Sequence, residues 1–113
     1  MTKLNTESRD KTMYIFTSDP GHGWLRVLKT EIKPIQDKIS KHSYMNGKYV
    51  YLEEDCDAGI FMLHKWGSYD EAHKHIKDNS VETTKIRSYE QYSPDTILEM
   101  DILEQEHKFE NKP

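Results

Sequence analysis

The first part of the chain alternates short apolar runs with turn-forming residues. Residues 13–17 read Met-Tyr-Ile-Phe-Thr and are followed by a loop over residues 18–23 that contains two glycines and a proline, which predicts a strand and a tight connection. Residues 24–28 form a second candidate strand. The isoleucines that follow have helical spacing, but Pro34 would break a long helix, so one short helix is expected over residues 30–36.

Asn46 and Gly47 stand between two aromatic runs. Asn-Gly in this setting is the preferred sequence of a type I′ hairpin turn. A turn formed by these two residues places Tyr44 opposite Tyr49, so their rings are expected to form a cross-strand pair. The sequence therefore predicts a β-hairpin with this register.

Carboxylates before an apolar run predict a helix over residues 58–66, because the free N–H groups of a helix start attract negative charge. Asp55 or Asp57 is the expected N-terminal cap, and Gly67 is expected to end the helix.

Residues 68–77 allow two interpretations. Ser68 and Glu71 have the spacing of a capping box, which favours a second helix, while an edge strand fits the same segment equally well. Residues 78–80 are expected to form a turn, and the alternation in residues 83–92 predicts a last strand.

Together these elements predict a single small α+β domain over residues 12–93, with a mostly antiparallel sheet of four or five strands and two or three short helices. Residues 1–11 are polar and are expected to form a flexible arm. Residues 94–113 carry six acidic and two basic side chains, which predicts an acidic amphipathic tail. The candidate binding residues of this tail are Leu98, Ile102 and Leu103.

The 113 residues carry 16 basic and 20 acidic side chains, a formal charge of -4. This balance argues against a protein that coats nucleic acid through phosphate contacts, and an acidic chain suits a protein partner better. The one cysteine, Cys56, cannot form an internal disulfide, which favours a reducing, cytoplasmic setting. No stretch approaches the roughly 20 apolar residues that cross a bilayer, so no membrane partner is expected.

The loop with Asp19, His22 and Trp24 combines an acid, an imidazole and two glycines. These groups could bind an anion or support acid–base chemistry, although the spacing of a phosphate-binding glycine loop is absent. The alternative interpretation is a tight strand connection that carries Trp24 into the core.

Four carboxylates gather after the hairpin, and they are Glu53, Glu54, Asp55 and Asp57. Carboxylate oxygens are the ligands that Mg²⁺ and Ca²⁺ prefer, but helix capping and a solvated acidic face explain the same spacing. These neighbours also disfavour a thiolate at Cys56.

The histidine cluster His64, His73 and His75 is expected to be exposed and polar rather than zinc-binding, because no second cysteine accompanies Cys56. We therefore predict no catalytic residue, no metal and no cofactor.

A set of tyrosines with nearby basic residues could form a stacking surface for single-stranded nucleic acid. The set consists of Tyr44, Tyr49, Tyr51, Tyr69, Tyr89 and Tyr92, with Lys48, Lys85 and Arg87. Tyrosine is also a good strand residue and a good interface anchor. Sheet structure is therefore the first interpretation, a protein interface the second and nucleic acid the third.

Four segments of the chain resemble a group of known proteins. They are DPGHGWL over residues 19–25, Ser-Tyr at 43–44, YLEEDCD over 51–57 and IRSY over 86–89. The group consists of small uncharacterised proteins encoded by bacteriophages and mobile elements. The resemblance implies a viral origin, a compact α+β domain and host takeover through binding of a host protein, and it implies nothing about catalysis.

The prediction for function is a phage-type, non-enzymatic binding protein that engages a host protein, such as a nucleic-acid-processing enzyme, and inhibits or redirects it. Its candidate binding residues are those of the loop, the carboxylate cluster and the tail. One alternative is a small metal-dependent enzyme for phosphate-containing substrates, with His22 and the carboxylates of residues 53–57 in one cleft. Another is a nucleic-acid-binding accessory module, although direct nucleic-acid binding is disfavoured. Homodimerisation through a sheet edge or the tail stays open.

Overall fold

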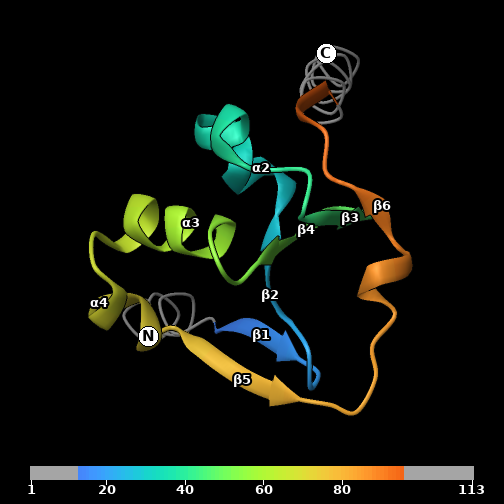
Figure 1. The fold of residues 1–113 in the computed structure, drawn as a ribbon. Helices are drawn as coiled ribbons and strands as arrows, with labels where there is room; N and C mark the ends of the chain where they lie inside the picture. Colours follow the sequence, from blue (N-terminus) through green and yellow to red (C-terminus); the bar gives the residue numbers. More distant parts are fainter. Residues whose placement is uncertain (1–12, 96–113) are drawn as a thin grey trace, which may run out of the picture.

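A computed structural model of the protein describes residues 13–95. Most of the predicted tail, with Leu98, Ile102 and Leu103, lies outside the described residues, as does the predicted arm over residues 1–11. The described chain forms one six-stranded sheet with helices packed against it (Figure 1). The predicted α+β class is confirmed, and the sheet has more strands than the four or five expected.

The strands are β1 (Tyr14–Ser18), β2 (Gly23–Leu28), β3 (Tyr44–Asn46), β4 (Tyr49–Glu53), β5 (Ile76–Ser80) and β6 (Glu90–Gln91). Their order across the sheet is β5-β1-β2-β4-β3-β6. All neighbouring strands are antiparallel except β1 and β5, which are parallel. The sheet is therefore mostly antiparallel, as predicted.

The helices are α2 (Lys29–Ile32), α3 (Asp57–Trp66) and α4 (Tyr69–His73), and the 3₁₀ turns are η1 (Lys33–Lys38) and η2 (Ile86–Ser88). Pro34 lies in the first turn of η1, where a missing N–H is tolerated. Gly67 ends α3 with a φ of +83°, as predicted. Of the two interpretations of residues 68–77, the structure has the helix over Tyr69–His73, where Ser68 Oγ accepts the N–H of Glu71, and the strand β5 begins only at Ile76. Within residues 13–95, none of the helices has the length and apolar content needed to cross a bilayer.

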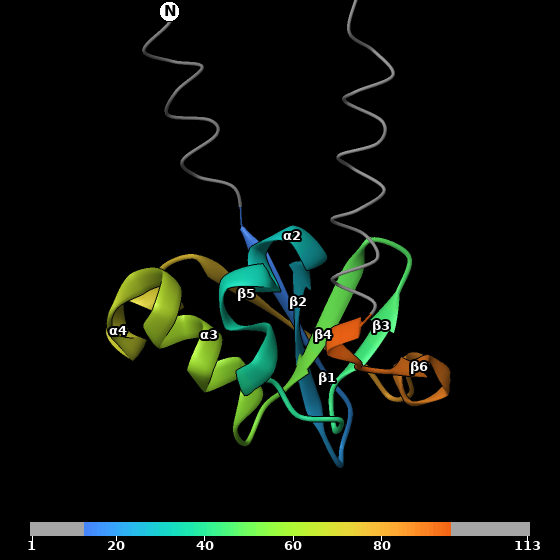
Figure 2. The ribbon, with the colours of Figure 1, turned by 90° about the horizontal axis from the view of Figure 1, so that it is seen from above.

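The apolar core lies between one face of the sheet and the layer formed by α2, η1 and α3 (Figure 2). Leu25 and Val27 of β2 and Val50 and Leu52 of β4 are fully buried there, and Phe61 of α3 packs among them. Because strand side chains alternate between faces, the intervening residues point away from these helices. We call this second side the open face, and it includes Ile15, Arg26, Leu28, Tyr49 and Tyr51.

The predicted hairpin is present, but its predicted register is wrong. Tyr44 pairs with Tyr51 instead of Tyr49, so the turn consists of Gly47 and Lys48. Among residues 13–95 only glycines have a positive φ, +61° at Gly47, whereas a type I′ turn also needs a positive φ at the preceding asparagine. Glycine in the first turn position is typical of a type II′ turn. The shift by two residues leaves every side chain on its predicted face.

The predicted turn at residues 78–80 is wrong, because these residues continue β5 beside β1. The predicted last strand over residues 83–92 is also largely wrong, since it contains η2 and only the short β6. Local side-chain bonds explain the difference: Thr84 Oγ1 accepts the N–H of Ile86 at 3.2 Å, and Ser88 Oγ donates to the carbonyl of Lys85 at 2.6 Å. Such bonds compete with sheet pairing.

Candidate functional site

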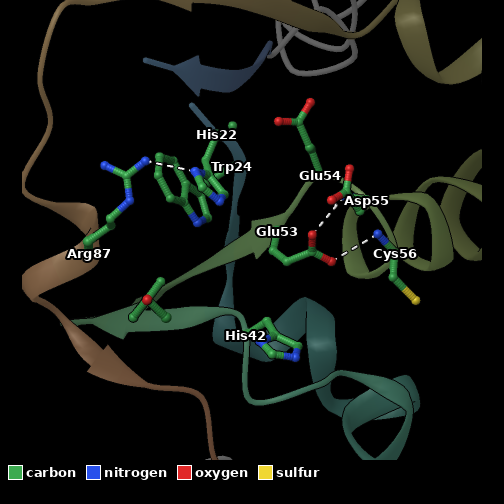
Figure 3. A pocket seen from close by; sticks show the side chains of 10 residues that line it. His22, Trp24, His42, Glu53, Glu54, Asp55, Cys56 and Arg87 are labelled. Carbon is green, nitrogen blue, oxygen red and sulfur yellow. Dashed lines mark hydrogen bonds between the residues drawn. The ribbon is translucent and has the colours of Figure 1, made fainter. Parts of the chain in front are cut away.

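A pocket of about 430 Å³ opens where β2 begins and β4 ends (Figure 3). One wall comes from the β1–β2 connection and the start of β2, one from the end of β4 and the β4–α3 connection, and one from η2. The first wall contributes His22 and Trp24, the second contributes Glu53, Glu54 and Asp55, and the third contributes Arg87. The pocket thus brings His22 together with Glu53, Glu54 and Asp55, as the alternative enzyme interpretation expects, but without Asp57. The sequence gives no signal for the place of Arg87 in it.

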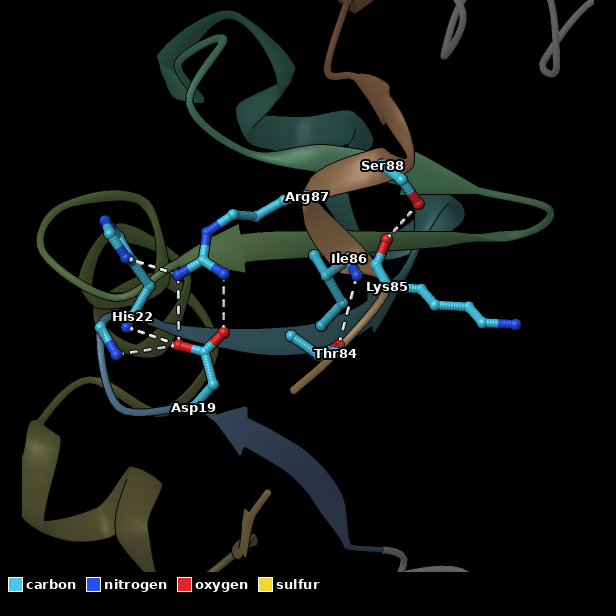
Figure 4. Close-up of polar contacts among 8 residues, drawn as sticks. Asp19, His22, Thr84, Lys85, Ile86, Arg87 and Ser88 are labelled. Atoms are coloured by element: carbon cyan, nitrogen blue, oxygen red, sulfur yellow. Dashed lines mark hydrogen bonds and ion pairs between the residues drawn. The ribbon is translucent and has the colours of Figure 1, made fainter. Parts of the chain in front are cut away.

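Asp19 does not line the pocket, but its side chain fixes the conformation of the β1–β2 connection in the first wall. Its Oδ1 accepts the backbone N–H groups of Gly21 at 3.0 Å and of His22 at 2.9 Å, which closes the β1–β2 connection (Figure 4). Arg87 donates to the same carboxylate through Nη1 at 2.7 Å and Nη2 at 3.2 Å. The hydrogen bonds from Arg87, followed by the one from the N–H of His22, lower the pKa of Asp19. The charge of Arg87 is thus balanced beside the pocket.

His22 and Trp24 hold the other side of the Arg87 guanidinium. Its Nη2 lies 2.8 Å from His22 Nδ1. Because arginine can only donate, Nδ1 accepts this bond, and the neutral ring carries its proton on Nε2. The guanidinium carbon is 5.1 Å from the centre of the Trp24 ring, and the His22 ring is stacked on the same indole at 6.0 Å. Trp24 itself is buried, as the structural interpretation of this loop predicts.

Glu53 provides the cap that the sequence assigned to Asp55 or Asp57. Its Oε1 accepts the N–H groups of Cys56 at 2.9 Å and of Asp57 at 3.3 Å, and its Oε2 accepts that of Asp55 at 2.8 Å. Cys56 occupies the N-cap position of α3 and supplies no side-chain bond, so the carboxylate at the end of β4 satisfies these donors instead.

Asp57 does not line the pocket, because its side chain is fully buried. Its Oδ2 accepts three bonds, from Ser43 Oγ at 2.6 Å and from Ser40 Oγ and N at 2.7 and 3.0 Å. Asp57 therefore fastens α3 to the segment that carries His42 into the pocket.

Glu54 and Asp55 are the two remaining carboxylates of the cluster. Both are exposed and line the pocket, and within residues 13–95 no ion pair or hydrogen bond is made by either carboxylate. The opposite wall carries the aromatic rings of Trp24 and Tyr44, which lie edge to face at 6.5 Å. Two exposed carboxylates without a partner among the described residues favour a cationic ligand.

The metal interpretation gains no geometric support. Nowhere in residues 13–95 do three or more His, Cys, Asp or Glu side chains lie where they could share one ion. The prediction that the histidine cluster is exposed is wrong for His75, which is partly buried and stacked on Trp66 at 5.2 Å. Its Nε2 lies 3.2 Å from Glu71 Oε2, and this bond, together with Lys74, lowers the pKa of Glu71.

Comparison of the chain with protein-family models, with curated proteins and with solved structures gave no match. The resemblance to phage proteins stays a prediction. The four segments on which it rests are brought together at one end of the sheet, because each contributes at least one lining residue to the pocket. The function must therefore be argued from the geometry of this pocket.

Proposed function

We propose that the protein is a non-enzymatic binding protein whose pocket accepts an arginine or lysine side chain of a partner protein. The observation that carries this proposal is the pair of exposed carboxylates, Glu54 and Asp55, on one wall of the pocket, without a cationic partner among residues 13–95. In the phage interpretation, the partner is a host protein with a basic surface, such as a nucleic-acid-processing enzyme in the cytoplasm.

The charges around the pocket support a basic ligand rather than an acidic one. Arg87 is the cation on the opposite wall, and Asp19 already neutralises it through two hydrogen bonds. An incoming basic group therefore meets Glu54 and Asp55 without strong repulsion from Arg87. Exposed carboxylates of this kind accelerate association and select the partner more than they add affinity.

The arrangement gives less support to a metal-dependent enzyme. Such an enzyme needs several carboxylates that converge on one ion. The carboxylate of Glu53 accepts three backbone N–H groups, and that of Asp57 is buried against Ser40 and Ser43. The carboxylates of Glu53 and Asp57 are thus occupied by hydrogen bonds within the fold and are not directed at a shared ion.

The proposal can be tested with defined peptides. Capped Gly-Arg-Gly and Gly-Lys-Gly peptides are titrated into the ¹⁵N-labelled full chain, with Gly-Gln-Gly as the neutral reference. We expect saturable shifts of the Trp24 indole signal with the basic peptides only. The double variant Glu54→Gln and Asp55→Asn should lose these shifts, whereas Asp70→Asn, an exposed acid on α4, should keep them. Equal shifts with the neutral peptide, or unchanged shifts in the double variant, would refute the proposal.

The partner can then be captured through the same carboxylates. A zero-length carbodiimide cross-linker joins a carboxylate to a lysine amine, so a bound partner should be linked to Glu54 or Asp55. Peptide mapping after capture from host lysate should find the link at these residues in the wild-type chain and not in the double variant. Links that form only at other acidic residues would contradict the assigned site.

A further inference from the structure

The open face carries a pair of cations above one tyrosine ring. The guanidinium carbon of Arg26 lies 4.6 Å from the centre of the Tyr49 ring, and Lys48 Nζ lies 5.7 Å from it. Within the described part of the chain, neither cation forms an ion pair with a carboxylate. Although the protein has a formal charge of -4, the described residues therefore present two cations here that no described carboxylate pairs.

Further aromatic rings extend from Tyr49 across the same face. The Tyr51 ring follows at 6.4 Å, and the Tyr89 ring lies 5.2 Å beyond Tyr51. Of the six tyrosines that the sequence suggests as a stacking surface, three lie outside this row. Tyr44 lies edge to face with Trp24 in the pocket that contains Glu54 and Asp55. Tyr69 lies on α4, and Tyr92 is buried with its hydroxyl bonded to the carbonyl of Gln36.

A hollow of about 250 Å³ lies beside this row of rings. Its lining includes Arg26, Lys48 and Tyr49, the apolar residues Ile15 and Leu28, and Glu31, whose carboxylate pairs with Lys65 at 3.4 Å. Leu28 is 37% exposed although it is a large apolar residue. Pockets for whole drug-sized ligands occupy about 300 to 1,000 Å³, so the hollow suits a single flat ring group with cations at its edge.

We propose that the open face binds single-stranded nucleic acid. One base occupies the hollow and stacks on the Arg26 guanidinium above Tyr49, and neighbouring bases contact Tyr51 and Tyr89. Arg26 and Lys48 neutralise the adjacent phosphates. Rings that stack bases, combined with cations that follow the backbone, are how proteins bind single strands without reading their sequence. An acidic peptide would use the two cations, but it would leave the row of rings and the apolar hollow without a role.

This site is independent of the proposed function. None of its residues lines the pocket that contains Glu54 and Asp55. The low overall charge argues against a protein that coats nucleic acid, but it does not oppose a local contact with a few phosphates.

The test is the fluorescence anisotropy of labelled oligothymidylate and oligouridylate with the full chain. We expect binding that weakens with salt, with a slope of log K against log salt of about -1.4 for two phosphate contacts. Lys48→Gln, in the exposed turn, should reduce this slope to about -0.7, while Lys74→Gln, the same charge change on α4, should leave it unchanged. The two oligonucleotides distinguish DNA from RNA as the source of the strand.

A second pair of variants tests stacking. Tyr89→Leu removes one ring that contacts a base and should weaken binding roughly 5- to 150-fold, the range for loss of one stacked base, and Tyr89→Phe should retain it. Circular dichroism of each variant checks that the fold is kept. The proposal is overturned if the wild-type chain does not bind at low salt, or if duplex, polyphosphate or polyglutamate binds as well as the single strand. Equal loss of binding in Lys74→Gln and Lys48→Gln would overturn it as well.

Discussion

Arg87 and Asp19 are 68 positions apart in the chain, yet their side chains form a two-pronged ion pair. The pair joins η2 to the β1–β2 connection beside the pocket. The carboxylate is only 4% exposed, whereas the arginine is 46% exposed. The less exposed partner also holds two backbone N–H groups, so Asp19 determines both the shape of its own loop and the position of η2.

The first prediction concerns the pH dependence of this pair. Asp19→Asn keeps an oxygen for the backbone N–H groups but loses the charge that binds Arg87. Because the pKa of Asp19 is lowered by Arg87, its ionised form stabilises the fold above the ordinary pKa of about 4, and this contribution is lost as the pH falls through the lower folded-state pKa. Urea unfolding should show the variant to be less stable at pH 7, with a difference that shrinks below about pH 4. A difference independent of pH would contradict the assignment.

The second prediction separates two neighbouring acids. Asp57→Ala removes the acceptor of two serine hydroxyls in a buried place, so the free energy of unfolding should fall by about 3 kcal/mol. Asp55→Ala is the matched control, because Asp55 is exposed and surface changes usually cost less than about 0.5 kcal/mol. Chemical denaturation of both variants measures the difference. Similar values for the two would show that the buried bonds contribute little.

The third prediction compares two glycines of one helix. Gly67 has a φ of +83° and open space around its Cα, so Gly67→Ala should cost about 1 kcal/mol through backbone strain alone. Gly59 lies inside α3, where alanine is favoured by up to about 1 kcal/mol. A Cβ there would lie 3.2 Å from the hydroxyl of Tyr69, which is half exposed and can move aside. Thermal unfolding should therefore show opposite signs for the two variants.

The fourth prediction concerns alkaline pH. Burial first, and the nearby charges of Asp37 and Asp57 second, raise the pKa of Tyr92 to about 12. A raised pKa means that the stability contribution is complete below the unfolded value of about 10 and is lost as the pH rises towards the folded value. The free energy of unfolding should fall over this range, and Tyr92→Phe should make the fall smaller. The same variant should lose about 1 kcal/mol at neutral pH with the bond to Gln36.

Local patterns in the sequence predicted the elements that local contacts determine. The first two strands, the hairpin and the end of α3 at Gly67 depend on residues within a few positions of one another. The spacing of Ser68 and Glu71 favours the helix α4 only as one of two interpretations. The parallel strand β5 could not be predicted in this way. It pairs with β1, which is far away in the sequence, and Ile76 is the only apolar residue of β5.

The candidate site was predictable in part for the same reason. One interpretation of the sequence places His22 and the carboxylates of residues 53–57 in one cleft, and His22, Glu53, Glu54 and Asp55 do line the pocket. The sequence could not show that Asp57 is turned inward by serines 14 and 17 positions away. Nor could the sequence show that Arg87 lines the pocket. Its partner Asp19 is distant in the chain, and no local sequence pattern predicts such a pair.

The strand order has a consequence for the folding of the chain during synthesis. The four central strands are made from residues 14–53, while both edges of the sheet, β5 and β6, are supplied by later residues. Until those residues emerge, β1 and β3 present unpaired backbone groups to which another chain can add. When β5 and β6 pair with β1 and β3, they therefore occupy the backbone groups to which another chain could add. The charged residues Lys77 and Asp78 of β5 make the new edge of the sheet a poor template for aggregation.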